Sequence, residues 1–125
     1  MNATEYIWFD GKLVPWKEAN VHVLTHSLHY GSAVFEGIRA YKCSDGTSAV
    51  FRLHDHAQRL INSGKIIRMD IPYTADELSK AVIDTLTANK MPDAYIRPLS
   101  FVGYGEMGVY PGNNPVQTII AAWSW

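Results

Sequence analysis

Two residues in the segment "AYIRPLSFV" have the chemistry to recognise a carboxylate. Tyr95 and Arg97 are two apart in a predicted strand, so both side chains point to the same face. A tyrosine hydroxyl beside a guanidinium on an otherwise apolar wall could bind a carboxylate. Because a buried arginine needs an anionic partner, the alternative is an ion pair inside the fold, with Glu36 as one candidate.

Arg59, in the segment "HDHAQRLI", is a candidate for binding a phosphate. On the helix predicted there it shares a face with His56, Asn62 and Ser63, opposite the apolar stripe. Hydrogen-bond donors gathered in this way could clamp a phosphate through a bidentate guanidinium. A solvated helical arginine would give the same pattern, and the residues alone leave both interpretations open.

The segment "VFEGIRAY" predicts a strand with two different faces. Phe35 and Gly37 fall on one face, and Glu36 falls on the other. An aromatic residue followed by a position without a side chain leaves room for a group to approach the backbone. A bulge or close strand packing at Gly37 is the alternative.

Two further patterns are weaker candidates. Gly103, Gly105 and Gly108 match G-x-G-x-x-G after a predicted strand, but "VYPGNNP" follows where a dinucleotide site needs a helix. A mobile surface loop is the favoured interpretation. The five histidines lack acidic or cysteine partners at a recognised spacing, so no metal site is predicted.

Composition narrows the class of protein. The 125 residues are 47% hydrophobic and 18% charged, with a net charge of −1, as in an ordinary globular protein. No basic footprint suggests binding to nucleic acid or to an anionic membrane, and no apolar run is long enough to span a membrane. The start lacks the features of a signal peptide, which leads us to expect a cytoplasmic protein.

The predicted elements follow the order strands, two helices, strands. Residues 6–9 and 12–14 flank Asp10-Gly11 as a hairpin, and residues 34–41 and 48–52 read as strands. Helical periodicity covers residues 54–68, and a capping box at Thr74 and Glu77 begins a second helix. Strands return at residues 94–102 and 118–123. This order predicts an α+β fold with antiparallel strands and two helices.

Three segments in combination resemble the branched-chain amino acid aminotransferases. They are "HSLHYGSAVFEGIRAY", "FRLHDHAQRL…SGKIIR" and "AYIRPLSFVG…MGV", and the resemblance runs from Tyr6 to about Trp123. These are fold-type IV enzymes that depend on pyridoxal 5′-phosphate. The resemblance implies the N-terminal small domain of such an enzyme, acting in branched-chain amino acid biosynthesis. It implies amino-group transfer between leucine, isoleucine or valine and 2-oxoglutarate, with glutamate as the other amino donor.

The resemblance also implies roles for several of the residues introduced above. Arg59 is similar to the arginine that grips the cofactor phosphate. Phe35 and Gly37 resemble the wall of the substrate side-chain pocket. Tyr95 is similar to a residue whose hydroxyl contacts the α-carboxylate of the substrate, and Arg97 to the partner of the distal carboxylate of glutamate.

Three other residues resemble positions that enter the active site of a neighbouring subunit: Tyr30, Met107 and Val109. That similarity implies a homodimer or a larger assembly, and it would explain the glycine-rich loop.

The catalytic lysine of the family has no counterpart in this chain. Lys65 lies in a family-like segment, but nothing supports it as the lysine that holds the cofactor covalently. The segment "PVQTIIAAWSW" reads as a buried strand with no polar tail. We therefore expect residues 1–125 to be the small domain of a longer enzyme, with no catalytic residue of its own and no activity alone. The alternatives are a D-amino acid or amine transaminase of the same fold, or a non-catalytic interaction module.

Overall fold

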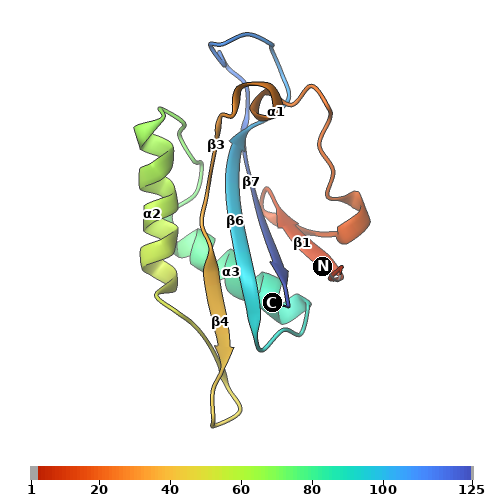
Figure 1. The fold of residues 1–125 in the computed structure, drawn as a ribbon, viewed down its shortest axis with the longest axis vertical. Helices are drawn as coiled ribbons and strands as arrows, with labels where there is room; N and C mark the ends of the chain where they lie inside the picture. Colours follow the sequence, from red (N-terminus) through yellow and green to blue (C-terminus); the bar gives the residue numbers. More distant parts are fainter. Residues whose placement is uncertain (1–2, 125) are drawn as a thin grey trace.

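A computed structural model describes residues 3–124 as one sheet with two long helices on one of its faces (Figure 1). Within these residues, no helix is both long and apolar enough to cross a membrane. The elements in chain order are β1 (Tyr6–Phe9), β2 (Lys12–Pro15), the 3-10 helix η1 (Trp16–Glu18), α1 (His26–Tyr30), β3 (Ala33–Phe35), β4 (Ile38–Lys42), β5 (Ser48–Val50), α2 (Leu53–Ile66), α3 (Ala75–Ala88), β6 (Ala94–Val102) and β7 (Val116–Trp123).

The first hairpin forms as predicted. β1 and β2 pair antiparallel with Phe9 opposite Lys12, so Asp10 and Gly11 make the two-residue turn. Both turn residues have positive φ, 45° at Asp10 and 94° at Gly11. Such a turn matches the twist of the flanking strands, and this is why the Asp-Gly dipeptide predicts it.

β6 is the centre of the sheet. The strand order is β2-β1-β7-β6-β4-β5, and β3 also pairs with β6, all antiparallel. β3 and β4 keep one register against β6, with Phe35 opposite Leu99 and Ile38 opposite Ile96. Glu36 therefore lies opposite Pro98, and its N–H donates to the Pro98 carbonyl at 3.0 Å.

The expected single strand over residues 34–41 is thus divided in two, and Pro98 is the reason. Proline has no N–H to return the second hydrogen bond of the pair to Glu36. The ladder opens at Glu36 and Gly37 without a change of register. The alternative of a bulge at Gly37 is therefore wrong.

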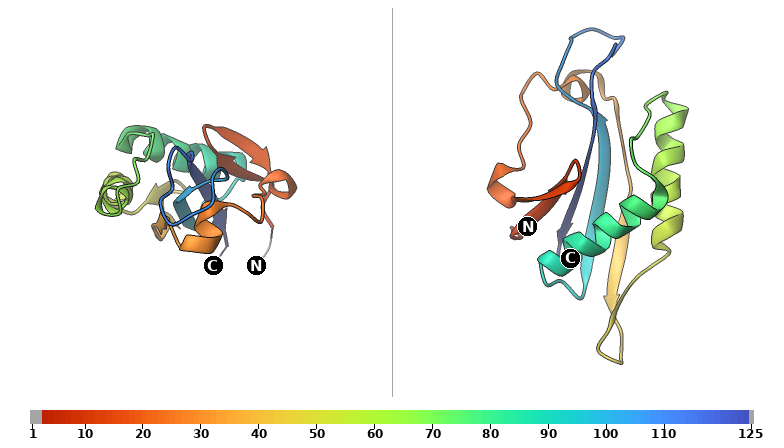
Figure 2. Two further views of the ribbon diagram at one scale, coloured as in Figure 1. Left: turned by 90° about the horizontal axis from the view of Figure 1, so that it is seen from above. Right: turned by 180° about the vertical axis from the view of Figure 1, so that it is seen from behind.

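Helices α2 and α3 cover one face of the sheet. α3 crosses behind the sheet in Figure 1 and in front of it in the right-hand view of Figure 2. Ala81, Val82 and Leu86 of α3 are buried against Ile96 and Ile120 at the centre of the main core. A second buried cluster, Ala57, Leu60, Ala75 and Leu78, joins α2 to α3. These are the apolar stripes that the helical periodicity predicts.

Two short elements, η1 and α1, are not predicted from the sequence, because pieces of three and five residues show too little periodicity. The strand expected over residues 48–52 ends earlier, at Val50. Arg52 has a φ of 47° and is the N-cap residue that precedes α2.

The capping box of α3 provides a test of this fold. The Thr74 hydroxyl accepts from the Glu77 N–H at 3.2 Å, and the Glu77 carboxylate accepts from the Thr74 N–H at 2.7 Å. Thr74→Ala should lower the free energy of unfolding by about 1 kcal/mol in denaturant titrations. Thr87→Ala, the same change at an exposed position of α3, is the control and should have little effect. Equal losses in the two variants would contradict the cap.

Candidate functional site

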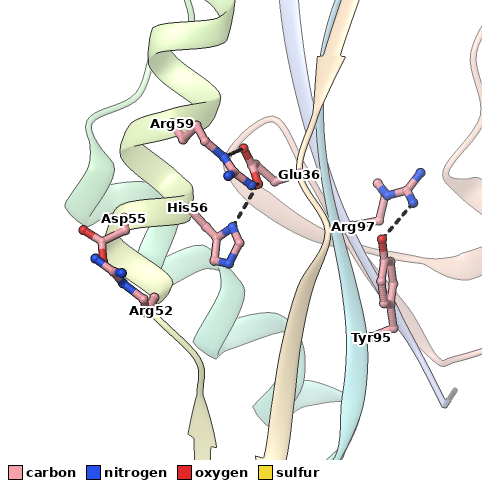
Figure 3. Close-up of polar contacts among 7 residues, drawn as sticks. All are labelled: Glu36, Arg52, Asp55, His56, Arg59, Tyr95 and Arg97. Atoms are coloured by element: carbon pink, nitrogen blue, oxygen red, sulfur yellow. Dashed lines mark hydrogen bonds and ion pairs between the residues drawn. The ribbon is translucent and has the colours of Figure 1, made fainter.

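Where β3 gives way to β4, adjacent side chains lie on opposite sides of the sheet, because side chains alternate along an extended chain. The carboxylate of Glu36 points toward α2, where its side chain is only 4% exposed. Phe35 and Gly37 lie on the other face, which the helices leave uncovered, together with Tyr95 and Arg97 of β6. Figure 3 shows Glu36 with His56 and Arg59 on one side of the strands, and Tyr95 and Arg97 on the other. The predicted two-faced strand is confirmed.

Glu36 is bound by two residues of α2. The Arg59 guanidinium donates from Nε to Oε1 and from Nη2 to Oε2, each at 2.6 Å. His56 Nδ1 lies 2.9 Å from Oε2. His56 and Arg59 are three residues apart and therefore share a helix face, so both reach one carboxylate.

The electrostatics of this cluster keep Glu36 ionised. Burial alone would raise the pKa of Glu36, but the hydrogen bonds and charges of Arg59 and His56 outweigh it and lower that pKa below its ordinary 4.5. The hydrogen bond to Glu36, and then the charge of Glu36, raise the pKa of Arg59 in turn. The buried charge is thus held by a bidentate pair of the strongest kind.

One sequence-based alternative is overturned by this pairing. Glu36 was a candidate internal partner for Arg97, but its carboxylate is bound by Arg59 on the opposite face of the sheet. Alternation along two paired strands makes contact between Glu36 and Arg97 impossible, because their side chains leave the sheet in opposite directions.

Arg59 combines a fixed guanidinium with access to solvent. Two of its nitrogens hold Glu36, yet 67% of its side chain is exposed. It lines a hollow of about 350 Å³ with Phe51, Arg52 and His56. Arg52 donates from Nε to Asp55 at 2.6 Å at the same end of α2. Each arginine of this hollow is paired with one carboxylate, and each keeps guanidinium N–H groups outside that pair that could donate to an anion such as a phosphate.

On the uncovered face, Phe35, Gly37, Tyr95 and Arg97 form one continuous wall. The Arg97 guanidinium carbon lies 4.4 Å from the centroid of the Phe35 ring, and Arg97 Nη2 donates to the Tyr95 hydroxyl at 3.0 Å. That hydroxyl lies directly over Gly37, where a Cβ would overlap it. The space that the sequence predicts at Gly37 is thus occupied by the tyrosine of the same wall.

Arg97 has one polar atom whose hydrogen-bonding capacity is not used. Its Nε is buried and has no hydrogen-bond partner among the described residues. No carboxylate within residues 3–124 is close enough to pair with its charge. A half-buried guanidinium whose charge no carboxylate of the described residues pairs favours an anionic group from a bound molecule.

The remaining predicted site residues lie at one end of the sheet. Tyr30 ends α1, while Met107 and Val109 lie in the loop that joins β6 to β7 (Figure 1). Their exposed fractions are 42%, 45% and 86%. Along β6, the near edge of the wall is Phe35 opposite Leu99, roughly 10 Å from Val102, and its far edge is Tyr95, roughly 23 Å from Val102. The structure does not bring these three residues to the wall of their own chain.

The glycine-rich loop has no dinucleotide geometry. After Gly108 the chain continues through bends and a turn to β7, and no helix begins there. Over residues 3–124, no group of three histidine, cysteine, aspartate or glutamate side chains could hold a metal ion.

Sequence reasoning missed the roles of Glu36, His56 and His26. The signal for the first two was present, since Glu36 is the one charged residue on the buried face of its strand and His56 shares a face with Arg59. His26 is buried and binds the loop after β6, a contact across 82 positions that no local pattern reveals.

Comparisons with known proteins extend over nearly the whole chain. Residues 33–125 match the family described as amino-transferase class IV. The branched-chain-amino-acid aminotransferase of Pseudomonas aeruginosa is 50% identical over 119 residues, which are 95% of this chain and 38% of that protein. The enzyme of the same name from Escherichia coli K12 is 48% identical over 122 residues, 97% of this chain and 39% of that protein.

Solved structures agree with these relatives. The crystal structure of the Escherichia coli branched-chain amino acid aminotransferase has a TM-score of 0.95 at 47% identity, over 98% of this chain and 40% of that one. The branched-chain aminotransferase of the archaeon Thermoproteus uzoniensis, solved with norvaline, has a TM-score of 0.92 at 45% identity, over 98% and 41%. This likeness confirms the predicted α+β fold of a fold-type IV small domain. The chain spans about two fifths of the length of the curated relatives it matches.

The ion pair of Glu36 makes a prediction about stability and pH. Glu36→Gln keeps the shape but removes the charge, and should lower the free energy of unfolding at pH 7 by about 2 kcal/mol. Because the folded pKa of Glu36 lies below the unfolded value, this stability is present above pH 4.5 and is lost as the pH falls through the folded pKa. In denaturant titrations from pH 7 to pH 3, the free energies of unfolding of wild type and Glu36→Gln should therefore become more similar as the pH falls.

Glu18→Gln, in the exposed η1, is the matched control and should be close to neutral at every pH. A difference between wild type and Glu36→Gln that stays constant down to pH 3 would contradict the proposed electrostatic origin.

Proposed function

The chain belongs to the amino-transferase class IV family, and from this premise we propose that the whole protein transfers amino groups between branched-chain amino acids and 2-oxoglutarate with pyridoxal 5′-phosphate. The names of the relatives that are 48–50% identical support this choice of substrates. Within the chain, the observation that carries the proposal is the wall of Phe35, Gly37, Tyr95 and Arg97. It offers an aromatic ring beside a guanidinium that no carboxylate of the described residues pairs with.

The wall accounts for two unlike substrates in one pocket. Phe35 presents an aromatic ring to the side chain of leucine, isoleucine or valine, while Arg97 lies against that ring and pairs with the distal carboxylate of glutamate. Tyr95 directs its hydroxyl over Gly37, where it contacts the α-carboxylate common to all these substrates. Because one methylene changes binding by only about 1–3 kcal/mol, we expect broad acceptance of the three branched side chains.

Arg59 fits the phosphate of the cofactor. Glu36 holds the guanidinium in a set orientation through Nε and Nη2, while most of the side chain remains open to solvent beside Arg52 and His56. A preoriented guanidinium loses little freedom when it binds an anion. The cofactor supplies the electron sink for the transfer, and two related structures carry pyridoxamine 5′-phosphate and N-(5′-phosphopyridoxyl)-L-glutamate by name.

Two parts of the active site come from outside these 125 residues in this proposal. The catalytic lysine belongs to a further domain, which agrees with the 38–39% of the relatives' length that the chain covers. A second copy of the protein supplies its Tyr30, Met107 and Val109. Their exposure supports a contribution to a neighbour.

Arg97 is the residue that separates the two substrate classes. In the complete protein, Arg97→Gln should lower kcat/KM for glutamate and 2-oxoglutarate about 100-fold, since a charge-assisted pair is lost. The half-reaction with leucine should change less than threefold. Single-turnover measurements with each amino acid give the two values. Arg68→Gln, which removes a charge from an exposed position, is the control. Equal losses for leucine and glutamate would assign Arg97 a structural role only.

Arg59 is tested through the phosphate itself. The wild-type protein should bind pyridoxal 5′-phosphate far more tightly than pyridoxal, and Arg59→Gln should reduce that ratio about tenfold or more, because a charge-assisted contact to the phosphate is lost. Equilibrium dialysis measures both affinities without reference to activity. An unchanged ratio in Arg59→Gln would show that this arginine serves only the ion pair with Glu36.

A further inference from the structure

His26 is a buried residue to which the proposed function assigns no role. It begins α1, and only 1% of its surface is exposed. Its Nε2 lies 2.7 Å from the Gly108 carbonyl oxygen, and its Nδ1 lies 2.9 Å from the Ser32 hydroxyl. A carbonyl oxygen can only accept, so Nε2 carries a hydrogen and donates it to Gly108. The imidazole thus links α1 to the tip of the loop between β6 and β7.

The point of attachment on the loop is specific. Gly108 lies between Met107 and Val109, and its φ of 137° is a conformation that side chains rarely permit. Its carbonyl is turned inward to His26, while the side chains on either side are exposed. Val109 is 86% exposed, so packing within this chain does not hold it in place. The hydrogen bond to His26 holds the backbone next to it.

The same imidazole also packs against Tyr30. The two rings are 4.5 Å apart between centroids and inclined by 33°. The backbone N–H of His26 donates to the Gly103 carbonyl at 3.3 Å, where the loop leaves β6. At the other side of the loop, Asn114 bonds to the backbone of Glu106 in both directions, at 2.6 and 2.8 Å. The loop is closed at its base by Asn114 and anchored at its tip by His26.

We propose that His26 is a positioning residue that holds Tyr30, Met107 and Val109 as one preformed apolar surface, through which the protein selects long apolar substrate side chains. The inference rests on the proposed function, in which this surface completes the pocket of a second copy. Exposed side chains discriminate well between substrates when their backbone is fixed before the substrate binds. Ordering the loop during binding would cost conformational entropy and weaken the affinity. The buried imidazole of His26 contacts Tyr30 and binds Gly108, the residue between Met107 and Val109. It therefore meets this requirement.

Two substitutions at the same position separate this role from simple burial. Glutamine can place an amide N–H close to the position of Nε2 and so keep the bond to Gly108, whereas asparagine reaches only as far as Nδ1. The control is His29→Asn on the same short helix, where Nε2 bonds to the Val23 carbonyl at 2.8 Å and not to the loop.

The experiment compares the complete proteins loaded with pyridoxal 5′-phosphate. The first readout is the ratio of kcat/KM for leucine to that for alanine, whose side chain is too short to need the surface. We expect His26→Asn to lower this ratio about tenfold, the scale of one lost buried contact. His26→Gln should restore most of it, and His29→Asn should leave it unchanged.

The second readout needs no activity. Hydrogen–deuterium exchange of peptides covering residues 104–112 should accelerate about tenfold in His26→Asn relative to wild type and His29→Asn. An unchanged leucine-to-alanine ratio in an active His26→Asn protein would overturn the inference, as would equal losses in the asparagine and glutamine variants. If wild type transfers no amino group from leucine, the proposed function fails and the selective role with it, while the exchange rates still decide whether His26 holds the loop.

Discussion

A buried carboxylate must be paired with cations, and the arrangement of this chain follows from how that requirement is met at Glu36. The carboxylate lies beneath α2, bound by Arg59 and His56 at 2.6 and 2.9 Å. These contacts set the rotation of α2 against the sheet. The pleat then requires Gly37 to face the opposite side, under the hydroxyl of Tyr95. One dipeptide therefore contacts a helix on one face of the sheet and Tyr95 on the other.

This arrangement suits the proposed chemistry. On the helix face, Glu36 orients Arg59, which we propose binds the phosphate of the cofactor. On the uncovered face, Arg97 has no carboxylate partner among the described residues, and we propose that it binds the carboxylate of the substrate.

Much of the fold could be predicted from local sequence, and the failures have a common cause. Asp10-Gly11 predicts its hairpin and Thr74 its helix, because neighbouring residues determine both. The break between β3 and β4 depends on Pro98, which is far away in the sequence and meets Glu36 only in the sheet. The partner of Glu36 was missed for the same reason. Alternation shows which face a residue takes, but only the packed structure shows what lies opposite that face.

The most direct measurement of the central claim is amino-group transfer by the complete protein loaded with pyridoxal 5′-phosphate. Leucine, isoleucine, valine and D-alanine would each be supplied with 2-oxoglutarate, and the glutamate formed would be quantified. We expect glutamate from the three branched-chain donors, at similar rates, and little from D-alanine. Glutamate from D-alanine with none from leucine, or no glutamate from any of the four, would contradict it.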